Sequence, residues 1–195
     1  MHVTAVTLAG RRVRLEPLSL AHADDLAVFC DEPETWRYFA IEPLASPEKV
    51  RAYIAEKQVQ AARGMWFAFA IVDRAGGRAV GSTSYLDISA ADRRLEIGST
   101  WLGAPARRTG INTECKFLLL RHAFETLGAN RVQLKTDARN ARSQAAIERI
   151  GATREGVLRA HMVMTDGFLR DSVMYSVIAS EWPAVKARLE GLMAR

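Results

Sequence analysis

The sequence predicts a mixed α/β domain of the α+β kind, and three observations carry this prediction. Three consecutive strand-like segments joined by short polar turns are typical of an antiparallel meander. They are residues 66–72, 79–86 and 94–102. A long amphipathic helix follows, because Phe117, Leu120, Phe124 and Leu127 recur at spacings of three and four. Helices and strands then continue without repeats or linkers, which indicates a single domain, 1–195.

Local signals define the other elements. A segment of alternating polarity that ends at Pro17 predicts the first strand, and Ser19 and Ser46 are placed to cap the next two helices. Asn140 before and Gly151 after a further stretch delimit another helix. The expected helices are 19–30, 46–63, 112–127, 140–150 and 180–193. The expected additional strands are 12–18, 131–136, 156–163 and 168–178.

Two connecting segments have a distinctive composition. Thr165-Asp166-Gly167 contains an Asp-Gly pair, which is a strong signal for a β-hairpin. The segment 31–45 contains Trp36, Tyr38 and Phe39. These aromatic residues either line a pocket or pack against the core.

Composition limits the class of protein. A hydrophobic fraction of 49% and a charged fraction of 25% are typical of a soluble globular chain. We find no signal peptide and no apolar run of about 18 residues, so we expect a cytoplasmic protein with no membrane partner. The net charge of +5 is scattered, so no nucleic-acid partner is expected, and an anionic cofactor explains the excess equally well. Cys30 and Cys115 lack ligand-like spacing, so we expect free buried thiols and no metal.

A short basic turn precedes the long helix. Arg107, Arg108, Thr109 and Gly110 place two cations and one residue without a Cβ where the first helical amides lack partners. Such amides and the positive end of the helix dipole favour an anion, and glycine lets a bulky ligand approach the main chain. The turn therefore predicts a phosphate-bearing ligand, although a short loop of this kind is more often only a connection.

Several short motifs occur in a fixed order along the chain. They are Leu95-Glu96-Ile97-Gly98, Arg107-x-x-Gly110, Thr113-Glu114-x-Lys116, Asn140-x-x-Ser143, Glu155-Gly156-x-Leu158-Arg159 and Asp166-Gly167-x-x-Arg170-Asp171. With the order of the elements, these motifs resemble the GNAT acetyltransferases, and more narrowly the RimJ/RimL type named for ribosomal-protein N-terminal acetyltransferases. The resemblance extends from Leu8-x-Gly10 to Glu181-Trp182-Pro183.

The resemblance implies a GNAT fold, in which a mixed, mostly antiparallel sheet of about seven strands is splayed between strands 4 and 5 and flanked by helices. Acetyl-CoA would lie in the splay, with its diphosphate on the amides that begin the long helix and its pantetheine arm along the last meander strand. The implied binding residues are Trp101, Leu102, Arg107, Arg108, Thr109, Gly110, Ile111, Asn112 and Asn140. Asn112 stands where the family usually has Gly or Ala, and Pro105 lies one residue closer to the glycine than is common. These departures leave the individual amide contacts open.

Acetyl transfer to an amine needs a base, donors for the thioester oxygen and an acid for the departing thiolate. The resemblance makes Glu96 the candidate base, acting through water, and the alternative is a surface carboxylate paired with Arg93 or Arg94. Ser143 is the candidate acid, or else only a residue in the first turn of its helix. An amide near Trp101 is the candidate oxyanion donor.

Four further positions are compared with the residues that the family has or that chemistry could use. Ile147 occupies the place of a tyrosine acid found in many members of the family. Met162 occupies the place of a glutamate of some ribosomal enzymes, so specificity for ribosomal proteins is not expected. His161 is an alternative base, but a lone histidine on a strand is more often structural. His122 lies inside the apolar helix and is expected at the edge of the core.

These features favour an acetyl-CoA-dependent N-acetyltransferase that acts by direct attack in a ternary complex, since no cysteine nucleophile lies near Glu96 or Asn140. The acceptor is a primary amine of a protein N-terminus or of a small molecule. One alternative is a GNAT-like module that binds CoA or a partner without turnover. Another is a nucleic-acid-binding protein, which the scattered charge disfavours. The sequence is also compatible with a homodimer formed through the strand-rich C-terminal half.

Overall fold

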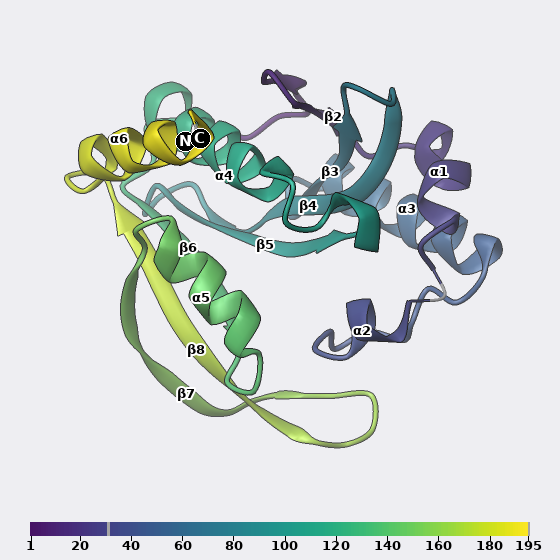
Figure 1. Cartoon of the computed structure of the whole chain (residues 1–195). Coiled ribbons are helices and arrows are strands. Elements are labelled where there is room, and N and C mark those ends of the chain that lie inside the picture. The colour runs from purple at the N-terminus through teal and green to yellow at the C-terminus, as the bar shows by residue number, and fades with distance from the viewer. Residues whose placement is uncertain (31, 195) are drawn as a thin grey trace.

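One eight-stranded sheet organises the fold, with its strands in the order β1-β2-β3-β4-β5-β6-β8-β7 (Figure 1). The computed structural model describes residues 1–30 and 32–194. The strands are β1 (Leu8–Ala9), β2 (Val13–Pro17), β3 (Phe67–Asp73), β4 (Arg78–Ser89), β5 (Arg94–Leu102), β6 (Arg131–Asp137), β7 (Thr153–Val163) and β8 (Leu169–Ile178). Neighbouring strands are antiparallel except β5 and β6. The predicted mixed sheet is confirmed; the extra strand, β1, is too short to produce an alternating pattern.

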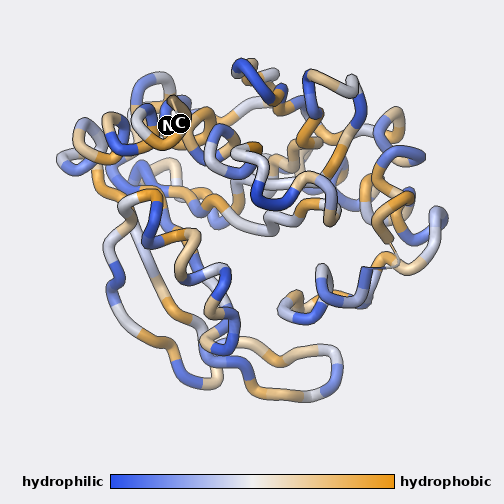
Figure 2. Tube along the Cα trace, viewed as in Figure 1, coloured by the Kyte–Doolittle hydropathy of each residue, from blue (hydrophilic) through white to orange (hydrophobic). Residues whose placement is uncertain are grey.

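Helices cover both faces of the sheet, and each face has its own apolar core. The helices are α1 (Ala23–Ala27), α2 (Pro33–Trp36), α3 (Pro47–Ala62), α4 (Ile111–Arg121), α5 (Ala141–Arg149) and α6 (Trp182–Met193). One core joins α4, α5 and α6 to side chains such as Leu95 and Ile97, and the other joins α1, α2 and α3 to Trp101. In Figure 2 apolar residues, drawn in orange, recur along the strands of both cores. Within the described residues, no helix combines the length and apolar character needed to cross a bilayer.

Two helix boundaries follow the predicted caps. The Ser46 side chain accepts a hydrogen bond from Lys49 N at 3.2 Å at the start of α3, and the Asn140 side chain accepts one from Ser143 N at 3.0 Å at the start of α5. Gly151 follows α5 with φ +97°, the left-handed conformation that glycine adopts without strain. These two caps are therefore confirmed.

Two predicted helices have a different extent. The segment 19–30 forms a 3-10 turn and then only the five residues of α1, because the amides of Phe29 and Cys30 close the helix with i→i−3 bonds. The segment 112–127 is α4 followed by a π-helical turn, His122–Thr126. Local sequence patterns do not distinguish these tighter and wider turns from an α-helix.

The parallel pairing of β5 and β6 is short. It covers three residue pairs and ends at Glu96 opposite Gln133, after which the strands diverge (Figure 1). Beyond Glu96, β5 still pairs with β4 on one edge, and among the described residues its other edge has no strand partner. The predicted splay is confirmed and lies between β5 and β6.

A β-bulge interrupts β5 beside this splay. Ser84 pairs with Gly98 and Ser82 with Trp101, so two residues of β5 lie opposite the single residue Thr83. Ser99, one of the two, has φ +48°. The bulge changes the direction in which the main-chain groups of β5 point as the strand passes the splay.

A buried carboxylate joins α4 to the N-terminal strands. Glu114 is 7% exposed and accepts hydrogen bonds from the amides of Arg11 (2.8 Å), Arg12 (2.7 Å) and Val13 (2.9 Å). A Cβ at Gly10 would lie 2.6 Å from the Glu114 carboxyl carbon, so this turn requires glycine. The carboxylate therefore fixes the start of β2 against the first turn of α4.

A buried lysine of α4 contacts the bulge. Lys116 is 7% exposed, and its Nζ donates to Thr100 Oγ1 at 2.7 Å, which in turn lies 2.7 Å from Thr83 Oγ1. Burial lowers the Lys116 pKa from its ordinary value to about 8, although Glu96 and the neighbouring Cys115 oppose this shift. The ammonium form is therefore costly to bury.

Replacing Glu114 tests the first of these contacts. Glu114→Gln keeps the shape of the side chain but turns an NH2 group towards amides that are themselves donors, so we expect the free energy of unfolding to fall by about 3 kcal/mol. Urea denaturation measures the loss. Glu190→Gln, on the exposed side of α6, is the control and should change stability by less than about 0.5 kcal/mol. Equal stability of the two variants would contradict the assigned role.

Replacing Lys116 tests the cost of the buried ammonium group. Below pH 8 the lysine is protonated in both the folded and unfolded states and the full cost is present; as pH rises from 8 towards 10.5, the folded protein loses this proton first and the cost disappears. Lys116→Met should therefore be more stable than the wild type at pH 7, by roughly 2 kcal/mol after loss of the Thr100 bond, and this gain should shrink by pH 10. Chemical denaturation across pH measures the difference. A gain independent of pH, or the same pH dependence in the exposed control Lys49→Met, would refute the explanation.

Candidate active site

The turn between β5 and α4 presents unpaired main-chain donors. Gly110 precedes α4 with φ +87°, and Arg108 has φ +62°. Among the described residues, the amides of 108–113 donate to no protein acceptor. Consecutive amides around left-handed residues form a concave anion-binding surface, and the α4 dipole adds to it. The geometry is that of a site for a phosphate or diphosphate group.

The two arginines of this turn are in different situations. The Arg107 guanidinium donates to Glu32 (2.5 Å), to Thr35 Oγ1 (2.6 Å) and to the Leu102 carbonyl (2.9 Å). It therefore ties the turn to α2 and is occupied by protein groups. Arg108 is exposed, so its charge is available beside the free amides.

A hollow of about 800 Å³ lies next to the turn. Arg11, Arg12 and Arg74 line it, and each donates to a main-chain carbonyl. In the described part of the chain, no carboxylate lies within 4.0 Å of these three guanidinium groups. They add positive potential beside the start of α4.

The other predicted binding residues differ in how their side chains are used. The Trp101 indole packs against Trp36, with ring centroids 5.3 Å apart, so only its main chain faces the splay. Ile111 belongs to the core. The Asn112 Oδ1 atom is buried and has no hydrogen-bond partner in the described structure. An orphaned acceptor beside the free amides supports a ligand that brings a donor to this corner.

Glu96 is buried at the point where β5 and β6 separate. It is 2% exposed, and its Oε2 accepts from Gln133 Nε2 at 2.9 Å and lies 3.1 Å from Lys135 Nζ. The alternative of a surface carboxylate paired with Arg93 or Arg94 is therefore wrong. Those two arginines bind Asn130 and Asp87 instead.

Glu96 and Ser143 approach the splay from opposite faces. Glu96 alternates with Leu95 and Ile97, which face α4, so its side chain lies on the face of α1–α3. Ser143 is a half-buried residue in the first turn of α5, and α5 packs on the α4 face through Ile147. No hydrogen bond joins the two described side chains, and the splay lies between them.

A second polar cluster, which sequence patterns did not reveal, lies further along β6. Asp137 is 1% exposed and accepts three hydrogen bonds from Arg139, two on Oδ1 and one on Oδ2. Burial raises the Asp137 pKa, but these bonds and the charges of Arg139 and Arg170 outweigh it and hold the pKa below its ordinary value. The sequence of β6 carries a weak signal for this cluster, because Gln133, Lys135 and Asp137 occupy alternate positions and so project from one face of the strand.

The histidines His122 and His161 and the cysteine Cys115 lie in different environments. The His122 pKa is lowered by burial and its Nδ1 lies 3.3 Å from the Tyr85 hydroxyl, so it is at the edge of the core as predicted. His161 is exposed on β7. Cys115 is fully buried, and burial raises its pKa to about 12. Its thiol therefore stays protonated at neutral pH.

The chain is similar to known proteins over most of its length. A family model described as "Acetyltransferase (GNAT) domain" matches residues 12–153. A solved structure from T. thermophilus, provisionally described as an acetyltransferase, is 43% identical with a TM-score of 0.88 and covers 98% of each chain. A GCN5-related N-acetyltransferase from Brucella melitensis is 30% identical with a TM-score of 0.91, covering 98% of this chain and 86% of the other.

A third relative points in the same direction. YdaF of Bacillus subtilis (strain 168), provisionally named a ribosomal N-acetyltransferase, is 34% identical over 110 residues, which are 56% of this chain and 59% of YdaF. The family match covers well over half of the chain, and it agrees with the splayed sheet and with the free amides before α4. The chain therefore belongs to the GNAT acetyltransferase family.

Proposed function

We propose that this chain is an acetyl-CoA-dependent N-acetyltransferase that acetylates a primary amine by direct attack in a ternary complex. One observation carries the proposal. The gap between β5 and β6 has unpaired amides at one end and the buried carboxylate of Glu96 at the other. A phosphate-bearing thioester and an amine can therefore meet from opposite sides of the sheet.

The residues at the splay fit acetyl-CoA. The amides of 108–113, with the exposed Arg108, would hold the diphosphate, and the unpaired edge of β5 at Trp101 and Leu102 would pair with the pantetheine arm. The orphaned Asn112 oxygen and the Asn140 side chain would accept from its amide groups. When bound, acetyl-CoA would supply an acetyl group activated as a thioester.

The chain's own groups match the three chemical requirements. Glu96 would accept a proton from the amine through water, held in place by Gln133 and Lys135. An amide at the bulge beside Ser99 would donate to the developing oxyanion. Ser143 would deliver a proton on the opposite face. The protonated, buried Cys115 supports direct transfer, because it offers no thiolate to carry the acetyl group.

The narrower assignment is the RimJ/RimL type. The motifs at 95–98, 113–116 and 166–171 support it, as does the similarity to YdaF. The proposed acceptor is accordingly a protein N-terminus or a small-molecule amine. Because Met162 replaces the glutamate of some ribosomal enzymes, ribosomal proteins are not proposed as substrates.

Self-association is a further part of this proposal. β7 is the last strand of the sheet and carries the exposed apolar side chains of Val157, Leu158 and Val163. In Figure 2 the end of the β7–β8 hairpin likewise shows orange residues. Exposed edges of this kind pair readily with another chain, which supports a homodimer formed through this half of the protein.

The second candidate function is a CoA-binding module without turnover. Ile147, in place of a tyrosine acid, favours it, because the departing thiolate then depends on Ser143. Binding of CoA by calorimetry, combined with thiol release from acetyl-CoA in the presence of an amine panel, separates the two. Binding with no thiol release for any amine would support the module.

Gly110→Val tests the proposed diphosphate site. The added side chain would block the approach to the turn, and CoA affinity measured by calorimetry should fall at least tenfold. Gly128→Val is the matched control, since Gly128 also has a positive φ (+65°) but lies after the π-helical turn with open space around it. Gly110→Val also crowds Arg12, whose Nη1 would lie 2.9 Å from the new Cβ, so the stability of both variants is measured alongside. Only Gly110→Val should lose affinity. Equal affinities would exclude this turn as the CoA site.

Glu96→Gln tests the proposed base. The substitution keeps the size of the side chain but removes the proton acceptor, so the rate of acetyl transfer should fall about 100-fold while CoA affinity stays within about twofold. Thiol release and calorimetry measure the two quantities. Glu34→Gln, on the exposed surface of α2, is the control and should retain the wild-type rate. An unchanged rate in Glu96→Gln would move the base to another group.

A further inference from the structure

A buried arginine on β8 lacks a full set of partners. Arg170 is 6% exposed, and its Nη1 donates to the Tyr38 carbonyl at 3.2 Å. Its Nε atom is also buried but has no hydrogen-bond partner among the described residues. A guanidinium group in this situation is costly unless an oxygen acceptor completes its hydrogen bonds.

The nearby carboxylate does not satisfy this need. Arg170 Nε lies 3.9 Å from Asp137 Oδ2, which is beyond hydrogen-bond distance. Both oxygens of Asp137 already accept from Arg139, through its amide, Nε and Nη2. Asp137 therefore neutralises the charge of Arg139 through direct hydrogen bonds, and it acts on the charge of Arg170 only at longer range.

A second unpartnered group lies on the same face of the same strand. Ser172 is two residues from Arg170 on β8, so both side chains lie on one face. It pairs across the sheet with Asp137, and its buried Oγ also has no partner in the described structure. Two neighbouring buried groups thus have unused hydrogen-bonding capacity.

This face of the sheet also carries the candidate base. Glu96, Lys135 and Asp137 project from it, because Glu96 binds Gln133 and Lys135, which alternate with the core residues of β6. Two carboxylates, Glu96 and Asp137, stand beside three cations, Lys135, Arg139 and Arg170. Asp166 also acts on Arg139, so the charges of the cluster balance, and Arg170 is the cation whose hydrogen bonds a ligand carboxylate would complete.

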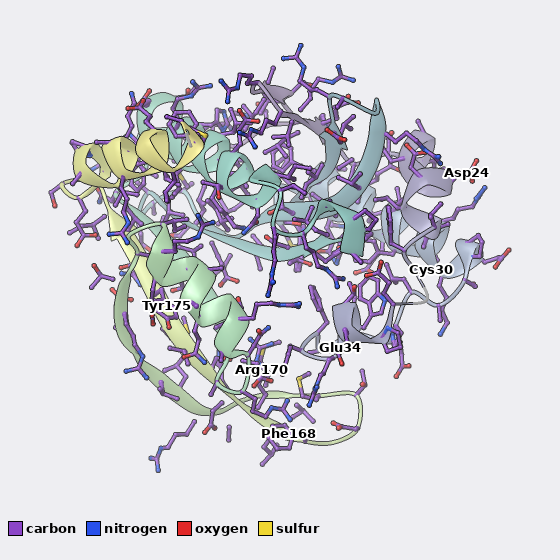
Figure 3. The ribbon with its side chains drawn as sticks, viewed as in Figure 1. Asp24, Cys30, Glu34, Phe168, Arg170 and Tyr175 are labelled. Atoms are coloured by element: carbon purple, nitrogen blue, oxygen red, sulfur yellow. The ribbon has the colours of Figure 1, made fainter. Side chains whose placement is uncertain are left out.

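The walls around Arg170 come from segments far apart in the sequence. Arg139 lies 3.8 Å from the centre of the Phe168 ring, at the β7–β8 hairpin, and 5.9 Å from that of Tyr38, which follows α2. Figure 3 shows Arg170 at the lower end of β8, near Phe168 and on the side towards α2. Arg139 itself is 44% exposed, so the cluster is open to solvent through this residue.

We propose that Arg170, assisted by Arg139, binds a carboxylate of the acceptor, so that the acetylated molecule is an amine carrying a distant negative charge. This inference rests on the proposed function and names its substrate class. Gln133, at the level of Glu96, and Asp137 are four residues apart on β6, so the amine and the carboxylate would be separated by about 13 Å. In an extended peptide this distance corresponds to an N-terminal amine and an acidic side chain about four residues away.

The test compares peptides that have a free N-terminus and an amidated C-terminus. Each pair differs only by Glu or Gln, placed at the second to the sixth position. With acetyl-CoA, kcat/KM should be at least tenfold higher for the Glu peptide, and this preference should be greatest near the fifth position, four residues after the N-terminal one. The same pairs are compared for binding by calorimetry in the presence of CoA, which requires no turnover.

The variants assign the preference to named residues. Arg170→Gln should remove the preference for Glu peptides, and Arg170→Lys should keep part of it. Ser172→Ala should reduce the preference without loss of charge. Arg159→Gln removes an exposed arginine of β7 and should leave it unchanged. Thermal unfolding checks each variant, and if Arg170→Gln does not fold, Arg170→Lys and Ser172→Ala carry the comparison.

The outcomes separate this inference from the proposed function. Equal rates and equal affinities for Glu and Gln peptides at every position would overturn the inference, as would a preference that survives in all the Arg170 and Ser172 variants. A preference in binding without acetyl transfer would support the acidic-ligand site and count against the enzyme. Transfer to neutral amines alone would support the enzyme and overturn the acidic acceptor.

Discussion

The parallel contact between β5 and β6 is the constraint on which the rest of the site depends. The pairing ends after three residue pairs. The polar and charged groups of the candidate site lie around the point where it ends. The free amides before α4 lie at the end of β5, and the charged residues Glu96, Lys135 and Asp137 follow the face of β6 and its neighbour. A fully paired sheet would consume the main-chain groups of both edges and leave no passage between its two faces.

The buried charged groups Glu114, Glu96, Asp137 and Arg170 differ in how their charge is compensated. Glu114 is compensated entirely by main-chain amides, which fix the N-terminal strands. Glu96 is compensated by the side chains of Gln133 and Lys135 from the neighbouring strand. Asp137 is compensated by three hydrogen bonds from Arg139, whereas Arg170 is compensated only in part, by Asp137 at 3.9 Å. Because burying an ion is costly unless its hydrogen bonds are complete, the incomplete set of partners at Arg170 supports the ligand site proposed there.

Sequence patterns predicted the fold well where the signal was local. The meander, the helices that Ser46 and Asn140 cap, and the Asp-Gly hairpin all depend on residues within one turn or two strands. The strand β1 and the true extent of α1 were missed. Two residues cannot show a period, and helix ends depend on contacts with other parts of the chain.

The candidate site was predictable in position and less so in its contacts. The sequence predicted free amides at the turn 107–112 and a Glu96 beside the splay, but it did not predict that Glu96 is buried, and the partners of Glu96 come from β6, with Gln133 lying 37 residues later. Arg107 illustrates the same limit, since its ion pair with Glu32 spans 75 residues and no local pattern announces it. The Arg170 cluster needs β6, β8 and the segment after α2 together. Such groupings exist only once the sheet is assembled.

The Glu114 contacts have a consequence for biosynthesis. The amides of 11–13 bind an acceptor that lies 101 to 103 residues further along the chain. At roughly 5–20 residues per second, translation delivers that acceptor about 5–20 s after the turn itself. Until then β2 can pair with β3, but the segment before it is not fastened. The start of β2 is therefore secured only after the first turn of α4 has been synthesised.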